Sequence, residues 1–267
     1  MRNSGSNRDN EKLIERTKDY QGKGNLAFFA DAVGELGTQG DGTMLIGLVG
    51  SRDFPGVALR QAQSMLRWDM SPSLWSHAFL IAGPPEKKGD VGSTPILEVT
   101  LHDRAGHFPE PEKNGVNKGY LRHYASPVVD ANVALISVSM KASELKLVAE
   151  RANDANFERV RHDFFRLIGT WQCYLWSFGA GANPLVEGFP MAAARYVEMA
   201  FEAIGVDITP GASERNSAPE HLWNTARWWD KNFKKMYKKE LSGLYVLRDK
   251  GCALLNWEDR QKLHEVQ

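Results

Sequence analysis

Runs typical of β-strands and runs typical of helices occupy different parts of this sequence, and this separation restricts the fold more than any other feature. The strand-like runs are MLIGLVG (44–50), WSHAFLIAG (75–83), PILEVTL (95–101) and VALISVSM (133–140). One short helix, 57–68, is expected among them, whereas 142–176 and 191–204 show helical patterns, the first broken near 153–154. Such segregation predicts an α+β fold rather than a doubly wound parallel sheet.

The bulk composition restricts the partners and the compartment. The 267 residues contain 33 Lys and Arg against 33 Asp and Glu, a formal charge of zero, so we expect no nucleic-acid partner. The two cysteines, Cys173 and Cys252, are expected to be reduced, because a chain of this length does not need a disulfide to fold. The N-terminal residues lack the apolar core of a signal peptide, and no apolar run is long enough to span a membrane. These features predict a cytoplasmic protein, with export by a route that uses no signal peptide as the alternative.

Two of the strand-like runs carry a histidine and a carboxylate that are expected to meet. If the runs form an antiparallel hairpin in which Gly83 pairs with Gly92, His77 stands opposite Glu98, with their Cβ atoms about 5 Å apart on one face. A carboxylate beside an imidazole fixes its tautomer and stabilises the imidazolium, which is the task of the orienting residue beside a general base. The alternative interpretation is a core histidine satisfied by a neighbour, with Glu98 as a charge on an edge strand.

The run 191–204 is expected to form a helix with one buried side. Pro190 precedes the helix and Gly205 follows it as a C-cap. The apolar stripe consists of Tyr196, Val197, Ala200, Phe201 and Ile204. A thiol in the first turn would have a lowered pKa at the positive end of the helix dipole, but the first turn, MAAA, contains no nucleophile.

The order of these motifs resembles a known family. Ser76-His77 is followed by the run ILE at 96–98, then by His162-Asp163-Phe164-Phe165, and last by a helix that ends at Gly205 before a Pro-Gly turn. This order resembles the circularly permuted branch of the NlpC/P60 papain-like cysteine hydrolases, in which the histidine strand precedes the cysteine helix. The resemblance covers roughly residues 40 to 225. It implies a permuted papain-like fold, in which a small antiparallel sheet packs against the helix that carries the nucleophile.

The resemblance also implies roles for three positions. His77 takes the place of the general base and Glu98 that of the orienting residue. The nucleophile is expected twelve residues before Gly205, at position 193, where this chain has Ala193. Either a native cysteine has been changed to alanine, or the chain is a natural pseudoenzyme. Cys173, which lies among aromatic residues, is expected to be a buried hydrophobic residue rather than the nucleophile.

The family implies a domain plan and a reaction. We expect residues 1–36 to be a partly disordered extension, 37–230 to be the papain-like domain, and 231–267 to be a basic and aromatic helical extension packed on it. With cysteine at position 193, the implied activity is that of a peptidase or amidase, acting on an amide in a peptide such as a cell-wall peptide, without metal or cofactor. A lipid ester hydrolase or acyltransferase acting on an acyl substrate is one alternative. A toxin-like effector or pseudoenzyme that binds an immunity or regulatory protein is the other.

Two further patterns are weaker. His102 and His107, with Asp103 nearby, lack further ligands at a recognised spacing, so no metal is expected there. The segment 228–241 combines an apolar stripe with flanking lysines, which suits either contact with a membrane surface or packing on the core with a solvated basic face. The stripe consists of Trp229, Phe233, Met236, Tyr237 and Leu241, and the flanking residues are Lys231, Lys234, Lys235, Lys238 and Lys239.

Overall fold

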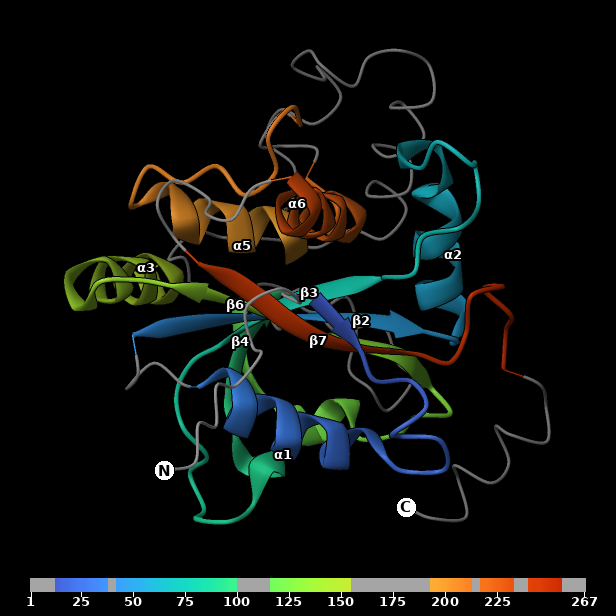
Figure 1. Cartoon of the computed structure of the whole chain (residues 1–267), viewed down its shortest axis with the longest axis horizontal. Coiled ribbons are helices and arrows are strands. Elements are labelled where there is room, and N and C mark those ends of the chain that lie inside the picture. The colour runs from blue at the N-terminus through green and yellow to red at the C-terminus, as the bar shows by residue number, and fades with distance from the viewer. Residues whose placement is uncertain are drawn as a thin grey trace, which may run out of the picture.

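The computed structural model describes residues 13–37, 42–99, 116–154, 193–212, 217–232 and 240–255. These residues form an α+β structure, in which a seven-stranded sheet has helices on both faces (Figure 1). The strands follow one another across the sheet in the order β1-β7-β6-β2-β3-β4-β5. All neighbouring strands are antiparallel except β1 and β7, which are parallel. The sheet is therefore larger than expected from the sequence, and mixed rather than purely antiparallel.

The four expected apolar runs all form strands, whereas the helix expected at 57–68 lies at 54–62 and is followed by a separate 3₁₀ helix. The strands are β1 (Leu13–Glu15), β2 (Thr43–Ser51), β3 (His77–Ile81), β4 (Pro95–Val99), β5 (Val116–Tyr120), β6 (Asp130–Ser139) and β7 (Leu241–Leu247). The α-helices of the described part are α1 (Asn25–Leu36), α2 (Phe54–Ala62), α3 (Ala142–Asp154), α5 (Ala193–Glu202) and α6 (Pro219–Asn232). Three short 3₁₀ helices complete it: η2 (Ser64–Leu66), η3 (Val91–Ser93) and η5 (Leu121–Tyr124).

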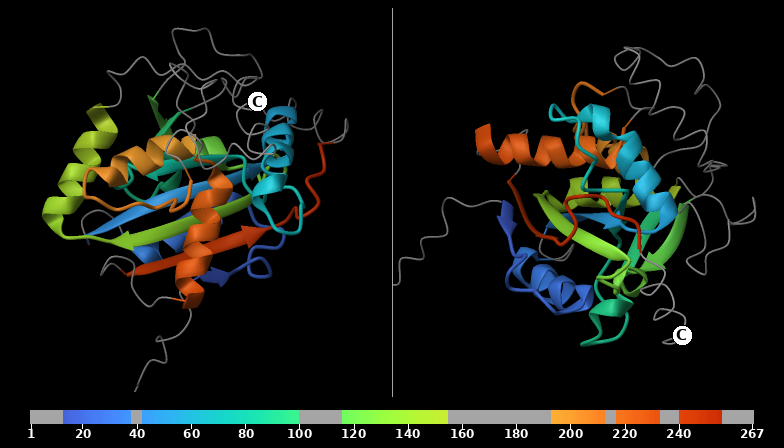
Figure 2. Two further views of the ribbon diagram at one scale, coloured as in Figure 1. Left: turned by 90° about the horizontal axis from the view of Figure 1, so that it is seen from above. Right: turned by 90° about the vertical axis from the view of Figure 1, so that its right-hand side faces the viewer.

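The two faces of the sheet have separate cores, and the alternation along each strand assigns residues to them. Ala78 and Leu80 of β3 belong to the apolar cluster that α3, α5 and α6 cover. Phe79 and Ile81, which alternate with them along the strand, belong to the cluster that α1 covers from the other side. Figure 2 shows α5 and α6 over one face and α1 against the other. The central strands β2 and β6 are almost entirely buried, because both of their faces are covered.

Both ends of the described chain contribute strands to this sheet. β1, from the expected N-terminal extension, pairs with β7, from the expected C-terminal extension, and β7 also pairs with β6. Helix α1 packs its buried phenylalanines, Phe28 and Phe29, into the cluster below the sheet. Leu241 lies in β7, so the expected helical stripe does not extend to it, while Trp229 is buried in α6.

The register of the β3–β4 hairpin differs from the expected one by two residues. Phe79, not His77, stands opposite Glu98, and Leu80 and Ile81 pair with Leu97 and Ile96. The expected Gly83–Gly92 pair does not form, because η3 occupies the end of the connection and the ladder resumes only where the N–H of Ala82 donates to the carbonyl of Pro95. An even shift leaves His77 and Glu98 on the same face. β4 is also an interior strand, since β5 pairs with its far side, so Glu98 is not an edge-strand charge.

Helix α5 buries the expected stripe. Tyr196, Val197, Ala200 and Phe201 are fully buried, and Ile204 packs partly buried against the same cluster. The chain leaves the helix through Gly205, whose φ of +67° favours glycine. Within the described ranges, no helix combines the length and the apolar character that crossing a membrane would require.

Candidate functional site

The structure brings His77 and Glu98 into contact, as the sequence predicted. Both residues lie in the described ranges. The Nε2 atom of His77 lies 2.8 Å from Oε2 of Glu98. His77 is the first residue of β3 and Glu98 the fourth of β4, so the contact crosses the hairpin diagonally. The Glu98 side chain is 2% exposed and that of His77 14% exposed, which places the carboxylate inside and leaves the imidazole at the edge of solvent.

Tyr124, at the end of η5, holds the same carboxylate. Its hydroxyl donates a short hydrogen bond to Oε2 of Glu98, the oxygen that also contacts His77. The Tyr124 ring is stacked on the His77 imidazole with centroids 5.8 Å apart and an interplanar angle of 29°. The same ring is also stacked on that of Phe79, with centroids 5.1 Å apart and an interplanar angle of 8°. Glu98 therefore contacts two residues, His77 and Tyr124, that also contact each other.

A second histidine approaches the other carboxylate oxygen. His123 Nδ1 lies 4.0 Å from Oε1 of Glu98, an ion-pair distance rather than a hydrogen bond, and its side chain is 44% exposed. Gly119 of β5 makes room for this arrangement. A Cβ added to Gly119 would stand 2.5 Å from Glu98 Oε1 and 3.2 Å from His123 Nδ1. Only glycine fits between the carboxylate and the histidine without a shift.

The electrostatics of the site keep Glu98 ionised. Burial alone raises the pKa of its carboxyl, but interactions with His123 and His77 and the hydrogen bond from Tyr124 together hold that pKa well below its usual range. An ionised carboxylate is an acceptor only, so its partners must donate. In the neutral imidazole, the proton therefore resides on Nε2 of His77, and Nδ1 is the basic nitrogen. Among the described residues, none forms a hydrogen bond with Nδ1 of His77.

Ala193 lies elsewhere. It is the first residue of α5 and is buried in the cluster on the upper face of the sheet, together with Ala78 and Leu80. His77 faces the opposite way, with Phe79 and Tyr124 as ring neighbours. The structure thus joins His77 to Glu98 but does not bring Ala193 to them. α5 nevertheless packs against the strand that carries His77.

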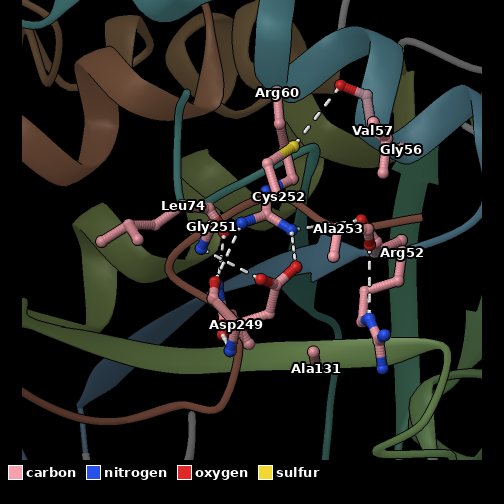
Figure 3. Close-up of polar contacts among 12 residues, drawn as sticks. Arg52, Gly56, Val57, Arg60, Leu74, Ala131, Asp249, Gly251, Cys252 and Ala253 are labelled. Atoms are coloured by element: carbon pink, nitrogen blue, oxygen red, sulfur yellow. Dashed lines mark hydrogen bonds and ion pairs between the residues drawn. The ribbon is translucent and has the colours of Figure 1, made fainter. Parts of the chain in front are cut away.

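A second buried polar cluster centres on Arg60 of α2 (Figure 3). The Arg60 side chain is fully buried, with Nη1 2.8 Å from Asp249 Oδ2, Nη2 2.9 Å from the Asp249 carbonyl and Nε 2.8 Å from the Ser73 carbonyl. Beside it, the thiol of Cys252 contacts the Val57 carbonyl, and burial raises the pKa of this thiol. Every nitrogen of the guanidinium donates to a group of the protein, so this cluster ties the C-terminal segment to α2.

Sequence reasoning missed Tyr124, His123 and Gly119. They lie in the run GYLRHY, which has no apolar periodicity, and they reach Glu98 only because β5 pairs with β4 and η5 folds back under the sheet. The residues His162-Asp163-Phe164-Phe165, Cys173, His102, Asp103 and His107, as well as 233–239, lie outside the described residues. In the part that is described, no group of three or more His, Cys, Asp or Glu side chains is arranged to hold a metal ion.

The function of this site has no support from similar proteins. Comparisons with protein-family models, with curated proteins and with solved structures found no match to this chain, so what the site can do has to be inferred from its geometry.

Proposed function

We propose that this chain is an acyl hydrolase in which His77 is the general base and Glu98 the residue that orients it. The supporting observation is the 2.8 Å contact between His77 Nε2 and a carboxylate that is buried and ionised. Such a carboxylate stabilises the imidazolium that forms when the base accepts a proton. It also leaves Nδ1 as the ring nitrogen that can accept a proton from a nucleophile.

The proposed reaction is the transfer of an acyl group to water. Nδ1 of His77 removes a proton from the nucleophile as it attacks the carbonyl carbon, and the carbonyl oxygen becomes an oxyanion. When the tetrahedral intermediate collapses, the imidazolium returns the proton to the leaving group, and the acid product departs. Base and acid are the same side chain in two protonation states, so the cycle leaves His77 unchanged.

In this chain the nucleophile is water, because Ala193 has no nucleophilic atom and lies on the other face of the sheet. This route favours an ester over an amide. An ester carbonyl is more electrophilic than an amide carbonyl, and an alkoxide is a better leaving group than an amide anion. A general base alone contributes only about 10²- to 10⁴-fold to the rate. We therefore propose an acyl ester, including a lipid ester, as the substrate of the chain with alanine at 193.

A cysteine peptidase or amidase is the second candidate, for a form of the chain with cysteine at position 193. The observation that favours it is the placement of residue 193 at the first position of α5, which packs against β3. A thiol at the start of this helix would have a lowered pKa. However, residue 193 and His77 lie on opposite faces of the sheet. A thiol at position 193 could transfer its proton to His77 only past the end of β3, where His77 is the first residue.

One experiment separates these candidates. We would assay p-nitrophenyl acyl esters and peptide p-nitroanilides with four proteins: the chain as it stands, Ala193→Cys, and each of the two with His77→Gln. Ester turnover by the unmodified chain that falls at least about 100-fold with His77→Gln supports the water route. Turnover confined to Ala193→Cys, with an acyl adduct at position 193, supports the cysteine route. If turnover does not depend on His77, His77 is not the general base. If none of the four proteins shows turnover, the hydrolase proposal is contradicted, and binding of a protein partner becomes the function to test.

A further inference from the structure

We infer that Tyr124 is the positioning residue of this site and that it acts on both members of the His77–Glu98 pair; its catalytic meaning rests on the proposed function. Its hydroxyl and its ring make different contacts. The hydroxyl donates to Oε2 of Glu98, and the ring stacks on the imidazole of His77. One side chain thus touches both the carboxylate oxygen and the face of the imidazole.

The two contacts restrict different motions. A carboxylate that accepts from two donors on one oxygen cannot rotate about its terminal bond without losing one of them. The stacking of the imidazole on the Tyr124 ring, at an interplanar angle of 29°, hinders rotation that would turn Nε2 away from Glu98. Because the same residue imposes both restrictions, the geometry of base and carboxylate is set as a unit. Partners of this kind fix the tautomer of a functional histidine and the direction of its reactive nitrogen.

Tyr124 is itself held from below by helix α1. The buried side-chain amide of Asn25 donates to the Tyr124 carbonyl at 2.9 Å and to the Asp130 carbonyl at 2.8 Å. The backbone N–H of Asn25 donates to the carbonyl of Ala125, which follows Tyr124 in the sequence. Phe79, stacked on the Tyr124 ring, completes the support. A positioning residue must be more rigid than the group it positions, and these contacts tie η5 to α1 and to β6.

Tyr196 provides a matched control for the loss of a buried tyrosine hydroxyl. It lies in α5 on the opposite face of the sheet, is fully buried, and donates to the Ala152 carbonyl at 2.7 Å. Tyr124→Phe and Tyr196→Phe each remove one hydroxyl from one buried hydrogen bond. Both are expected to lower stability to a similar extent, but only Tyr124→Phe acts on the His77–Glu98 pair.

The test is ¹⁵N NMR of the histidine side chains in the full chain, followed by ester kinetics. We expect His77 to be protonated at Nε2 in its neutral form, and Tyr124→Phe to convert this single state to a mixture with the Nδ1-protonated form. If turnover occurs, kcat should fall about 10- to 100-fold in Tyr124→Phe with KM unchanged, by analogy with the loss of outer partners of metal-ligating histidines. Tyr196→Phe should change neither the His77 tautomer nor kcat.

Each outcome is informative. A native chain in which His77 is protonated at Nδ1 overturns the inference even if Tyr124→Phe does not fold. An Nε2-protonated state that survives Tyr124→Phe unchanged also overturns it, while leaving the hydrolase proposal intact if turnover still depends on His77. A tautomer change in Tyr124→Phe without any hydrolysis supports the positioning role and contradicts the proposed function.

Discussion

His77 Nε2 reaches Oε2 of Glu98 across a diagonal of the β3–β4 pair, at 2.8 Å, although Glu98 stands opposite Phe79 in the ladder. Diagonal neighbours in an antiparallel sheet have Cβ atoms about 7–8 Å apart or somewhat less, farther than directly opposite residues. A long side chain is needed to bridge that separation. The contact therefore depends on the length of glutamate and not only on its charge.

We expect Glu98→Asp to break the contact while conserving the carboxylate. An aspartate is one methylene shorter, so its oxygens would fall short of His77 and leave a buried charge with fewer donors. We predict a loss of about 1–3 kcal/mol in the free energy of unfolding, the cost of an unsatisfied buried polar group. The His77 tautomer should become mixed in ¹⁵N NMR. Native stability and an unchanged tautomer in Glu98→Asp would show that the length of the side chain is unimportant.

The low pKa of the Glu98 carboxyl predicts how the protein responds to acid. Its folded-state pKa lies well below the usual value of 4.5, so its contribution to stability is fully present above about pH 4.5. That contribution is lost as the pH falls from 4.5 toward the folded-state pKa, because the unfolded chain then binds a proton that the folded chain does not. In Glu98→Gln, stability should be lower at pH 7 but should change less between pH 5 and about pH 3.5.

Urea unfolding at a series of pH values measures this difference. The control is Glu86→Gln, which removes an exposed carboxylate that is also hydrogen-bonded, to Lys118 at 2.7 Å and to Tyr120 at 3.0 Å. Solvent screens that group, so its removal should leave the acid profile close to that of the unmodified chain. Parallel acid profiles for the unmodified chain and Glu98→Gln would contradict the assignment of an ionised buried carboxylate.

Gly119→Ala tests whether the space beside Glu98 is needed. The new Cβ would meet Oε1 of Glu98 at 2.5 Å and Nδ1 of His123 at 3.2 Å, so the carboxylate or the histidine must move. We predict a loss of about 1–3 kcal/mol, typical of overpacking, together with loss of any His77-dependent turnover. Gly34→Ala is the control, because a Cβ there meets nothing within 4 Å and the residue lies within α1. That substitution should stabilise the protein by roughly 0.5–1 kcal/mol.

The sequence was sufficient to predict the α+β class, most strands and the shared face of His77 and Glu98, because apolar runs and alternation are local properties. The register was wrong by two residues because the connection contains η3, a turn with no apolar pattern. β1 and β5 were missed for a related reason. LIE is too short and VNKGY too polar to be recognised without the strands beside them.

The candidate site shows the same division. The pair His77–Glu98 could be predicted because both residues lie on apolar strands with a clear period. Tyr124 and His123 could not, since they meet Glu98 through a 3₁₀ helix whose position depends on the pairing of β5. Alternation placed His77 with Phe79, but the face that α5 covers depends on the topology of the whole sheet. The family resemblance implied that residue 193 lies beside His77, and the structure places it on the other face.

The buried Arg60–Asp249 pair provides the last prediction, which concerns how the C-terminal segment is held. Arg60→Met keeps an unbranched apolar stem but removes the donors to Asp249 and to the Ser73 carbonyl. Removal of one partner from a buried pair costs about 3–5 kcal/mol, because the remaining charge is left uncompensated. Arg16→Met is the matched control, since Arg16 and Glu35 form a partly exposed pair at 3.4 Å. Pairs of that kind contribute about 0–1 kcal/mol.

Urea unfolding compares the two variants, and amide hydrogen exchange shows where Arg60→Met acts. The N–H of Leu255 donates to the Arg52 carbonyl, beyond Asp249 along the chain, and it should lose protection when the Arg60 anchor is removed. The protection of the α5 amides should fall only by as much as the global free energy of unfolding falls. If both variants cost less than about 1 kcal/mol, the Arg60 cluster is not an anchor, because a buried pair should cost several times more than an exposed one. If Leu255 loses protection only with global unfolding, the C-terminal segment is not held locally by Arg60 but forms part of the same cooperative unit as the sheet.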